Sequence, residues 1–174
     1  PHLEAAAQNF DGITYAKGAS TLKQLVSYVG FDTFIEAARV YFKRFAWGNT
    51  SLQDFLDVLN EVSGRDMQTW SQAWLQTSGL STLGTRRVYR EDGKLQDLYL
   101  AQQLPDTQPA GIGRPHVVKL ETFILQEEKL VSTGTLSLEY PADPIAEYRV
   151  SLPQEHKKTV GEADLLMLNA EDHT

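Results

Sequence analysis

The sequence contains no cysteine, and this absence excludes a whole class of architectures. With 0 cysteines among its 174 residues, the chain has neither disulfide bonds nor thiolate metal ligands. An apolar core must therefore hold the fold together. The composition allows one, because 41% of the residues are hydrophobic and 22% are charged, which is close to the usage of globular domains.

Long apolar runs and clusters of basic residues are also missing. No apolar run approaches the roughly 20 residues that cross a bilayer, so we expect a soluble protein without membrane insertion and place it in the cytoplasm. The formal net charge is −7, and the longest basic runs are the pairs Arg86-Arg87 and Lys157-Lys158. Phosphate backbones are bound by clustered Lys and Arg. We therefore expect no nucleic acid partner.

The residue patterns of metal-dependent and nucleophilic catalysis are absent from the sequence. There is no H-E-x-x-H motif, and no two histidines lie one helical turn apart. There is also no G-x-S-x-G segment. We therefore expect this chain by itself to bind no metal, and its histidines to lie on surfaces or in loops. They are His2, His116, His156 and His173.

A starting methionine and a leader segment are lacking too. The first residue is Pro1, and no charged-then-apolar stretch follows it. We expect the chain to be a piece of a longer protein.

The first half of the sequence has the periodicity of helices. Leu22, Leu25, Val26 and Val29 recur at helical spacing and are predicted to form one apolar stripe, and Gly30 is expected to end that helix. Asp32 is the predicted cap of a second helix. Ser51 and Asp54 resemble a capping box that opens a third, and Gly64 is expected to end it. A fourth helix is predicted from about Asp66, with Trp70, Trp74 and Leu75 buried. The apolar face of the second helix is predicted to comprise Phe34, Ala38, Tyr41, Phe42 and Phe45.

From about residue 84 the period changes to two, which is typical of strands. The turn Glu91–Lys94 contains Asp-Gly and predicts a hairpin. Further alternating strands are predicted for His116–Leu125, Leu130–Tyr140, the region of Tyr148–Leu152 and Leu165–Leu168. In the second of these, Leu130, Leu136, Leu138 and Tyr140 are expected on one side. Several short strands with turn signals favour a β-sandwich. The predicted class is α+β in two parts, with a helical part at 1–83 and a β-sandwich at 84–174.

One segment combines a tyrosine with small residues at the start of a predicted helix. It reads Phe10-Asp-Gly-Ile-Thr-Tyr15-Ala-Lys-Gly-Ala-Ser20. Small residues let a helix approach another backbone closely, and a phenol can donate a hydrogen bond to an oxyanion. By itself a lone tyrosine is usually a packing residue, so both interpretations stay open at this point.

The segment Ile13–Lys23 resembles the Y-x-K-G-A segment of aminopeptidase N-like zinc metallopeptidases, relatives of leukotriene A hydrolase. The similarity continues through Phe45–Phe55 and from Val62 to Leu75. It implies the C-terminal helical part of a metallopeptidase catalytic domain followed by a β-sandwich. It also implies that Tyr15 is catalytic and stabilises the tetrahedral intermediate, and that Phe10 lines the first substrate pocket.

The same resemblance implies a cofactor and partners that this chain does not supply. The H-E-x-x-H motif and the G-x-M-E-N segment of the family are missing from the sequence. In the family they precede the tyrosine, so zinc would belong to the full-length enzyme and not to this fragment. The implied partners are peptide substrates, cleaved at their N-terminal residue, and the missing zinc-bearing part of the same chain. We expect the isolated chain to be inactive and to expose apolar surface around Tyr15 and Leu22.

Two other functions remain open from the sequence. The chain could be a non-catalytic helical and β-sandwich module that binds protein partners, since fold does not decide function. The parent could instead be an epoxide hydrolase, as in one branch of the family. The β-sandwich half argues against the second option, because that branch resembles enzymes without this domain.

Overall fold

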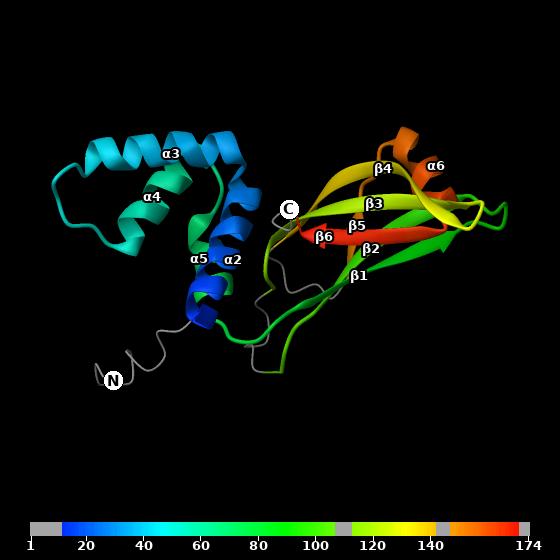
Figure 1. The fold of residues 1–174 in the computed structure, drawn as a ribbon, viewed down its shortest axis with the longest axis horizontal. Helices are drawn as coiled ribbons and strands as arrows, with labels where there is room; N and C mark the ends of the chain where they lie inside the picture. The colour runs from blue at the N-terminus through cyan, green and yellow to red at the C-terminus, as the bar shows by residue number, and fades with distance from the viewer. Residues whose placement is uncertain (1–11, 107–112, 142–146, 171–174) are drawn as a thin grey trace. The chain divides into compact units, whose positions relative to one another are not determined.

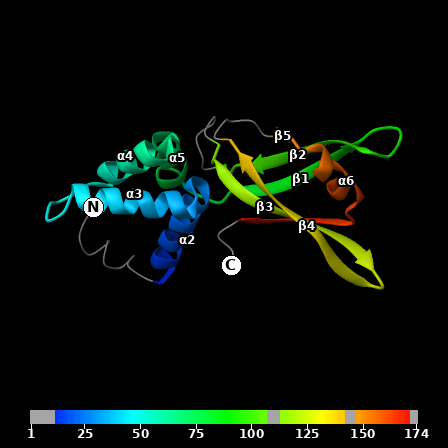
Figure 2. The ribbon, with the colours of Figure 1, turned by 90° about the horizontal axis from the view of Figure 1, so that it is seen from above.

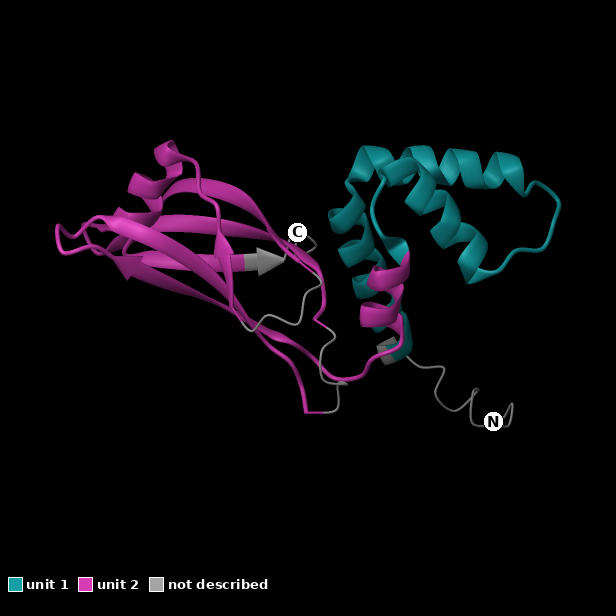
Figure 3. Cartoon of the chain, turned by 180° about the vertical axis from the view of Figure 1, so that it is seen from behind, with its two compact units in different colours: residues 1–67, 174 teal, residues 68–173 magenta. Residues whose placement is uncertain are grey.

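The computed structural model describes residues 12–106, 113–141 and 147–170, and the chain has the predicted α+β class. It divides into two compact units, residues 1–67 with residue 174, and residues 68–173 (Figure 3). The first unit is helical and the second contains all the described strands.

The described residues of the first unit form three helices, α2 (Gly12–Val29), α3 (Phe31–Arg44) and α4 (Leu52–Ser63) (Figure 1). Gly30 separates the first two with a φ of 87°, a conformation that a residue without a Cβ adopts at little cost. The predicted Asp32 cap is wrong, because Gly30 occupies the N-cap position and no side chain caps the helix. Asp32 lies in the first turn of α3, where a negative charge still favours the helix dipole.

The predicted start and end of α4 are confirmed. The Ser51 side chain accepts a hydrogen bond from the Asp54 backbone, and the Asp54 carboxylate accepts one from the Ser51 backbone. Gly64 ends the helix in the left-handed region, with a φ of 66°. These local signals identify α4 because they satisfy backbone groups at both of its ends.

Aromatic side chains join α3 to α4. The rings of Tyr41 and Phe55 lie 5.2 Å apart, and those of Phe34 and Phe55 lie 6.1 Å apart, both edge to face. Buried Ala37, Leu56 and Leu59 complete this interface. The prediction that Phe42 lies on the same face of α3 was wrong, because its side chain is 72% exposed. Phe42 follows Tyr41 directly, so its side chain points about 100° further around the helix.

In the part of the second unit that the structure describes, there are a helix, two sheets and a second helix. Helix α5 (Met67–Leu75) begins at the boundary between the units, and α6 (Gln154–Glu162) lies between the last two strands in sequence. One three-stranded sheet has the order β1-β2-β5 and the other β4-β3-β6 (Figures 1 and 2). All described strand pairs are antiparallel. The strands are β1 (Thr82–Tyr89), β2 (Leu95–Gln103), β3 (His116–Gln126), β4 (Lys129–Tyr140), β5 (Glu147–Val150) and β6 (Leu165–Ala170).

The core of the second unit is built from the inward positions of both sheets. Leu98 and Leu100 of one sheet and Val118 and Leu120 of the other are at most 2% exposed. Each pair has the spacing of two that was predicted from the sequence. The hairpin at Asp-Gly is confirmed as β1–β2, with Gly93 in the left-handed region at a φ of 77°.

A bulge in β4 reverses the side on which one predicted core residue lies. Thr122 pairs with Gly134 and Phe123 with Ser132, so Thr133 is an extra residue in β4. Side chains alternate along a strand, and an extra residue shifts that alternation by one. Leu130 therefore lies on the opposite face from Leu136 and is 52% exposed. The prediction that both share a face was wrong.

Helix α6 was not predicted from the sequence. It follows Pro153, which is the N-cap residue, and its only buried residue is Val160, at 0% exposure. Gly161 brings the helix close to β2, because a Cβ at this position would lie 2.9 Å from Leu95 Cβ. Its remaining residues are mostly polar, so the apolar periodicity that identifies an amphipathic helix is absent.

Buried Arg114 joins α5 to the strands of the second unit. Its guanidinium donates to acceptors at or after the end of the helix: Ala73 O, Thr77 Oγ1, Ser78 O, Gly79 O and Ser81 Oγ. Arg114 N and O also bond the side chain of Gln102, at 2.9 Å each. Burial lowers the pKa of Arg114, and no carboxylate pairs with it in the described part of the chain. The negative C-terminal end of the α5 dipole stabilises the positive charge in place of a carboxylate.

No helix among the described residues is both long and apolar enough to span a membrane.

The division between the two compact units falls between Met67 and Gln68 in the sequence, so nearly all of α5 is grouped with the strands. That grouping reflects spatial contacts, and the domain boundary between residues 83 and 84 stays a prediction.

We expect Arg114→Lys to lower the free energy of unfolding of the second unit by about 2–4 kcal/mol, because lysine keeps the charge but cannot form the same set of hydrogen bonds. Denaturant unfolding followed by tryptophan fluorescence measures the change. Arg90→Lys is the matched control, since Arg90 is exposed and its hydrogen bonds within the described residues are backbone bonds, to Lys94 O and from Gly93 N. Equal stability of the two variants would contradict the role of Arg114.

Candidate functional site

Tyr15 lies near the beginning of α2, as the sequence predicted. The helix starts at Gly12, and the Tyr15 side chain is 67% exposed. The phenol is therefore accessible from outside the packed helices, as a hydrogen bond to a substrate would require.

The segment around Tyr15 is exposed on all sides of the helix. Every residue from Thr14 to Ser20 is exposed, and a helical turn takes 3.6 residues, so the whole circumference is included. An added Cβ at Gly18 would meet nothing within 4 Å. In the described part of the chain, the small residues of this segment are therefore not used for close helix packing.

The C-terminal half of α2 holds the helix in place. Leu25 is 3% exposed and Val29 is 7% exposed, and both belong to the predicted apolar stripe. The guanidinium of Arg65 lies 4.5 Å from the centre of the Tyr28 ring, a cation–π contact. Leu22, at the edge of this stripe, is 54% exposed. The expected exposure of Tyr15 and Leu22 is confirmed.

Other predicted residues of the segment have simpler surroundings. Lys17 is exposed, and its backbone carbonyl accepts a hydrogen bond from Thr21 Oγ1 at 3.0 Å. Phe10, the predicted substrate-binding residue, lies outside the described residues. Its proximity to Tyr15 stays a prediction.

The residues that the structure describes do not form a metal site. No group of at least three His, Asp or Glu side chains in these residues lies close enough to hold a metal ion. His116 is buried beside Trp74, with ring centroids 5.0 Å apart, so the expectation that it is a surface or loop histidine was wrong. A catalytic zinc needs about three protein ligands, and the donor set present here does not fit it.

Relatives of the chain are aminopeptidases. The Peptidase family M1 domain matches residues 2–76. The chain is also 41% identical to aminopeptidase N of Streptomyces lividans over 178 residues, which cover 98% of this chain and 20% of that protein. The chain is therefore similar to peptidase family M1 over residues 2–76, and to an aminopeptidase N over nearly its whole length. Its resemblance to the aminopeptidase N-like group is thereby confirmed.

Plant members of the M1 family match a shorter part of the chain. Aminopeptidase M1-A of Oryza sativa subsp. japonica is 33% identical over 95 residues, which cover 55% of this chain and 10% of that protein. The chain thus spans a fifth or less of the length of these M1 relatives.

The fold is also similar to that of a solved aminopeptidase structure. Legionella pneumophila aminopeptidase A, crystallised in complex with aspartic acid, matches with a TM-score of 0.53 and 19% identity. The match covers 79% of this chain and 16% of that one. At this identity the likeness concerns the fold alone.

Sequence reasoning missed two charged arrangements in the second unit. One is the buried cation Arg114. Its only feature in the sequence is that it is a positively charged residue in a segment rich in Gly and Pro, which does not predict burial. The other is a cleft that contains Asp97, Arg149 and Lys157. These three residues lie on separate elements, and no sequence motif joins them.

We expect Gly18→Ala to stabilise α2 of this chain by up to about 1 kcal/mol, because the site is open and alanine loses less backbone entropy. Hydrogen exchange of the α2 amides measures the effect. Ser20→Ala, in the same exposed segment, is the control and should give a smaller change of the same sign. Faster exchange in Gly18→Ala would show that a neighbour packs against Gly18.

Proposed function

We propose that this chain is part of a zinc-dependent aminopeptidase of the membrane alanyl aminopeptidase type, which removes N-terminal residues from peptides. The observation that carries the proposal is the exposed phenol of Tyr15 within the Ile13–Lys23 segment. The M1 match over residues 2–76 supports it. The cytoplasmic location remains a prediction from the sequence.

In the proposed reaction, the Tyr15 hydroxyl donates a hydrogen bond to the oxyanion that develops on the substrate carbonyl. The bond strengthens as negative charge accumulates, so it stabilises the transition state more than the bound substrate. Phe10 is proposed to contact the first side chain of the peptide. Zinc would activate water and polarise the carbonyl, but its ligands would lie in other residues of the longer enzyme.

The isolated chain is proposed to be inactive as a peptidase. A single oxyanion donor contributes about 10² to 10³ to turnover, which is a small part of the acceleration an enzyme provides. Tyr15 therefore acts only together with the rest of the catalytic groups.

We expect Tyr15→Phe in the full-length enzyme to lower turnover by about 10² to 10³ without loss of bound zinc, because only the hydroxyl is removed. Hydrolysis of an aminoacyl reporter substrate and metal analysis are the measurements. A chimera in which this chain replaces the matching segment of the Streptomyces lividans aminopeptidase N offers a second host.

The matched control is Tyr28→Phe on the same helix. Phenylalanine keeps the ring that contacts Arg65, so turnover should stay within about twofold of the unchanged enzyme. Normal turnover in Tyr15→Phe would refute the catalytic role. A full-length protein without a zinc motif would instead favour the non-catalytic interaction module.

A further inference from the structure

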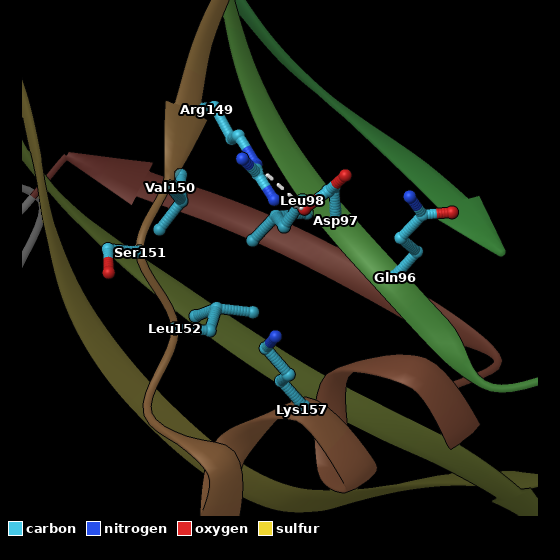
Figure 4. A pocket seen from close by; sticks show the side chains of 8 residues that line it. All are labelled: Gln96, Asp97, Leu98, Arg149, Val150, Ser151, Leu152 and Lys157. Carbon is cyan, nitrogen blue, oxygen red and sulfur yellow. Dashed lines mark hydrogen bonds and ion pairs between the residues drawn. The ribbon is translucent and has the colours of Figure 1, made fainter. Parts of the chain in front are cut away.

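A cleft opens in the second unit where β5 ends before its neighbour does. Strand β2 runs from Leu95 to Gln103, but it pairs with β5 only between Leu98 and Ala101. In the described chain no strand lies beside β2 at Gln96 and Asp97 on the β5 side. The chain after Val150 leaves the sheet toward α6, and a cleft of about 230 Å³ remains between them (Figure 4).

The cleft combines an apolar floor with a charged rim. Leu98, Val150 and Leu152 line its base; Leu98 and Leu152 belong to the core of the unit and are 1% and 9% exposed, and partly buried Val150 is the most accessible of the three. Because core packing holds these side chains, the floor is preformed. Lys157 extends into the cleft from α6, opposite Arg149 of β5 (Figure 4).

The two cations of the cleft differ in how they are paired. Asp97 Oδ1 accepts a hydrogen bond from Arg149 Nε at 2.7 Å, and Arg149 Nη2 forms an ion pair with the same oxygen at 2.5 Å. The ammonium of Lys157 has no ion-pair partner within the residues described. Two cations and one carboxylate thus line the cleft of a chain whose net charge is −7. The unpaired positive charge is the one at Lys157.

We propose that this cleft binds a carboxylate ligand the size of an amino acid, with Lys157 as the partner of the carboxylate. An ammonium group on a flexible stem suits a single carboxylate as a point charge. The apolar floor favours a ligand with a short aliphatic portion over a fully hydrated anion. The volume of the cleft limits the ligand to about the size of an amino acid or a small derivative of one. The proposal does not depend on the aminopeptidase function.

The test is an NMR titration of the 174-residue chain with two ligands that differ only in the carboxylate. N-acetylleucine should shift the amide signals of Gln96, Asp97 and Lys157 in a saturable way. N-acetylleucinamide should bind at least about tenfold more weakly, because it cannot form the charge-assisted bond. Inorganic phosphate should also bind more weakly, since it lacks an aliphatic portion. Equal binding of the two leucine derivatives, or shifts confined to other residues, would overturn the proposal.

Lys157→Gln and Lys158→Gln form a matched pair on α6. Both remove one positive charge, but Lys158 does not line this cleft. Lys157→Gln should weaken binding of N-acetylleucine by about tenfold, whereas Lys158→Gln should change it by less than about twofold. Lys157→Arg should retain most of the affinity. If both Gln variants weaken binding equally, the ligand senses only the overall charge, and the assignment to Lys157 fails.

Discussion

The second unit depends on a buried guanidinium that has no carboxylate partner among the residues that the structure describes. Arg114 is 5% exposed, and carbonyl and hydroxyl oxygens at the end of α5 satisfy it. Burying a cation is costly unless its donors are bonded, so the helix end and the loop that carries Arg114 need each other. Trp74 adds to this connection by donating from Nε1 to Pro115 O at 3.0 Å. The connection explains why α5 is grouped with the strands, although the M1 match over residues 2–76 extends into it.

In the first unit, one half of a helix is packed and the other half carries the candidate chemistry. Leu25 and Val29 hold α2 against its neighbours, and Thr14–Ser20 remain exposed. Apolar burial stabilises a helix only along the residues that are buried. The Tyr15 segment therefore takes its helical form from the packed half. This arrangement suits a residue that acts on a substrate outside the helical unit.

The cleft beside β5 shows how the end of a strand creates a site. β2 continues past the last residue pair with β5, and α6 returns close to β2 at Gly161. Between them, core leucines form a floor that is not covered by a strand. The side chain of Lys157 on α6 then extends into this space, where β2 has no neighbouring strand in the described residues. Lys158 is the next residue on α6, so its side chain points about 100° further around the helix and does not line the cleft.

Local signals in the sequence determined the α+β class, the capping box at Ser51, the hairpin at Asp-Gly and the position of Tyr15 on a helix. These features depend on backbone groups and periodicities within a few residues, so neighbouring residues decide them. Only the tertiary structure decided that Leu130 faces away from the core, that the polar segment Gln154–Glu162 forms a helix, and that Arg114 and Lys157 have their present surroundings. In each of these cases the stabilising contacts come from residues distant in the sequence. One sequence read by itself does not reveal which distant residues are neighbours in space.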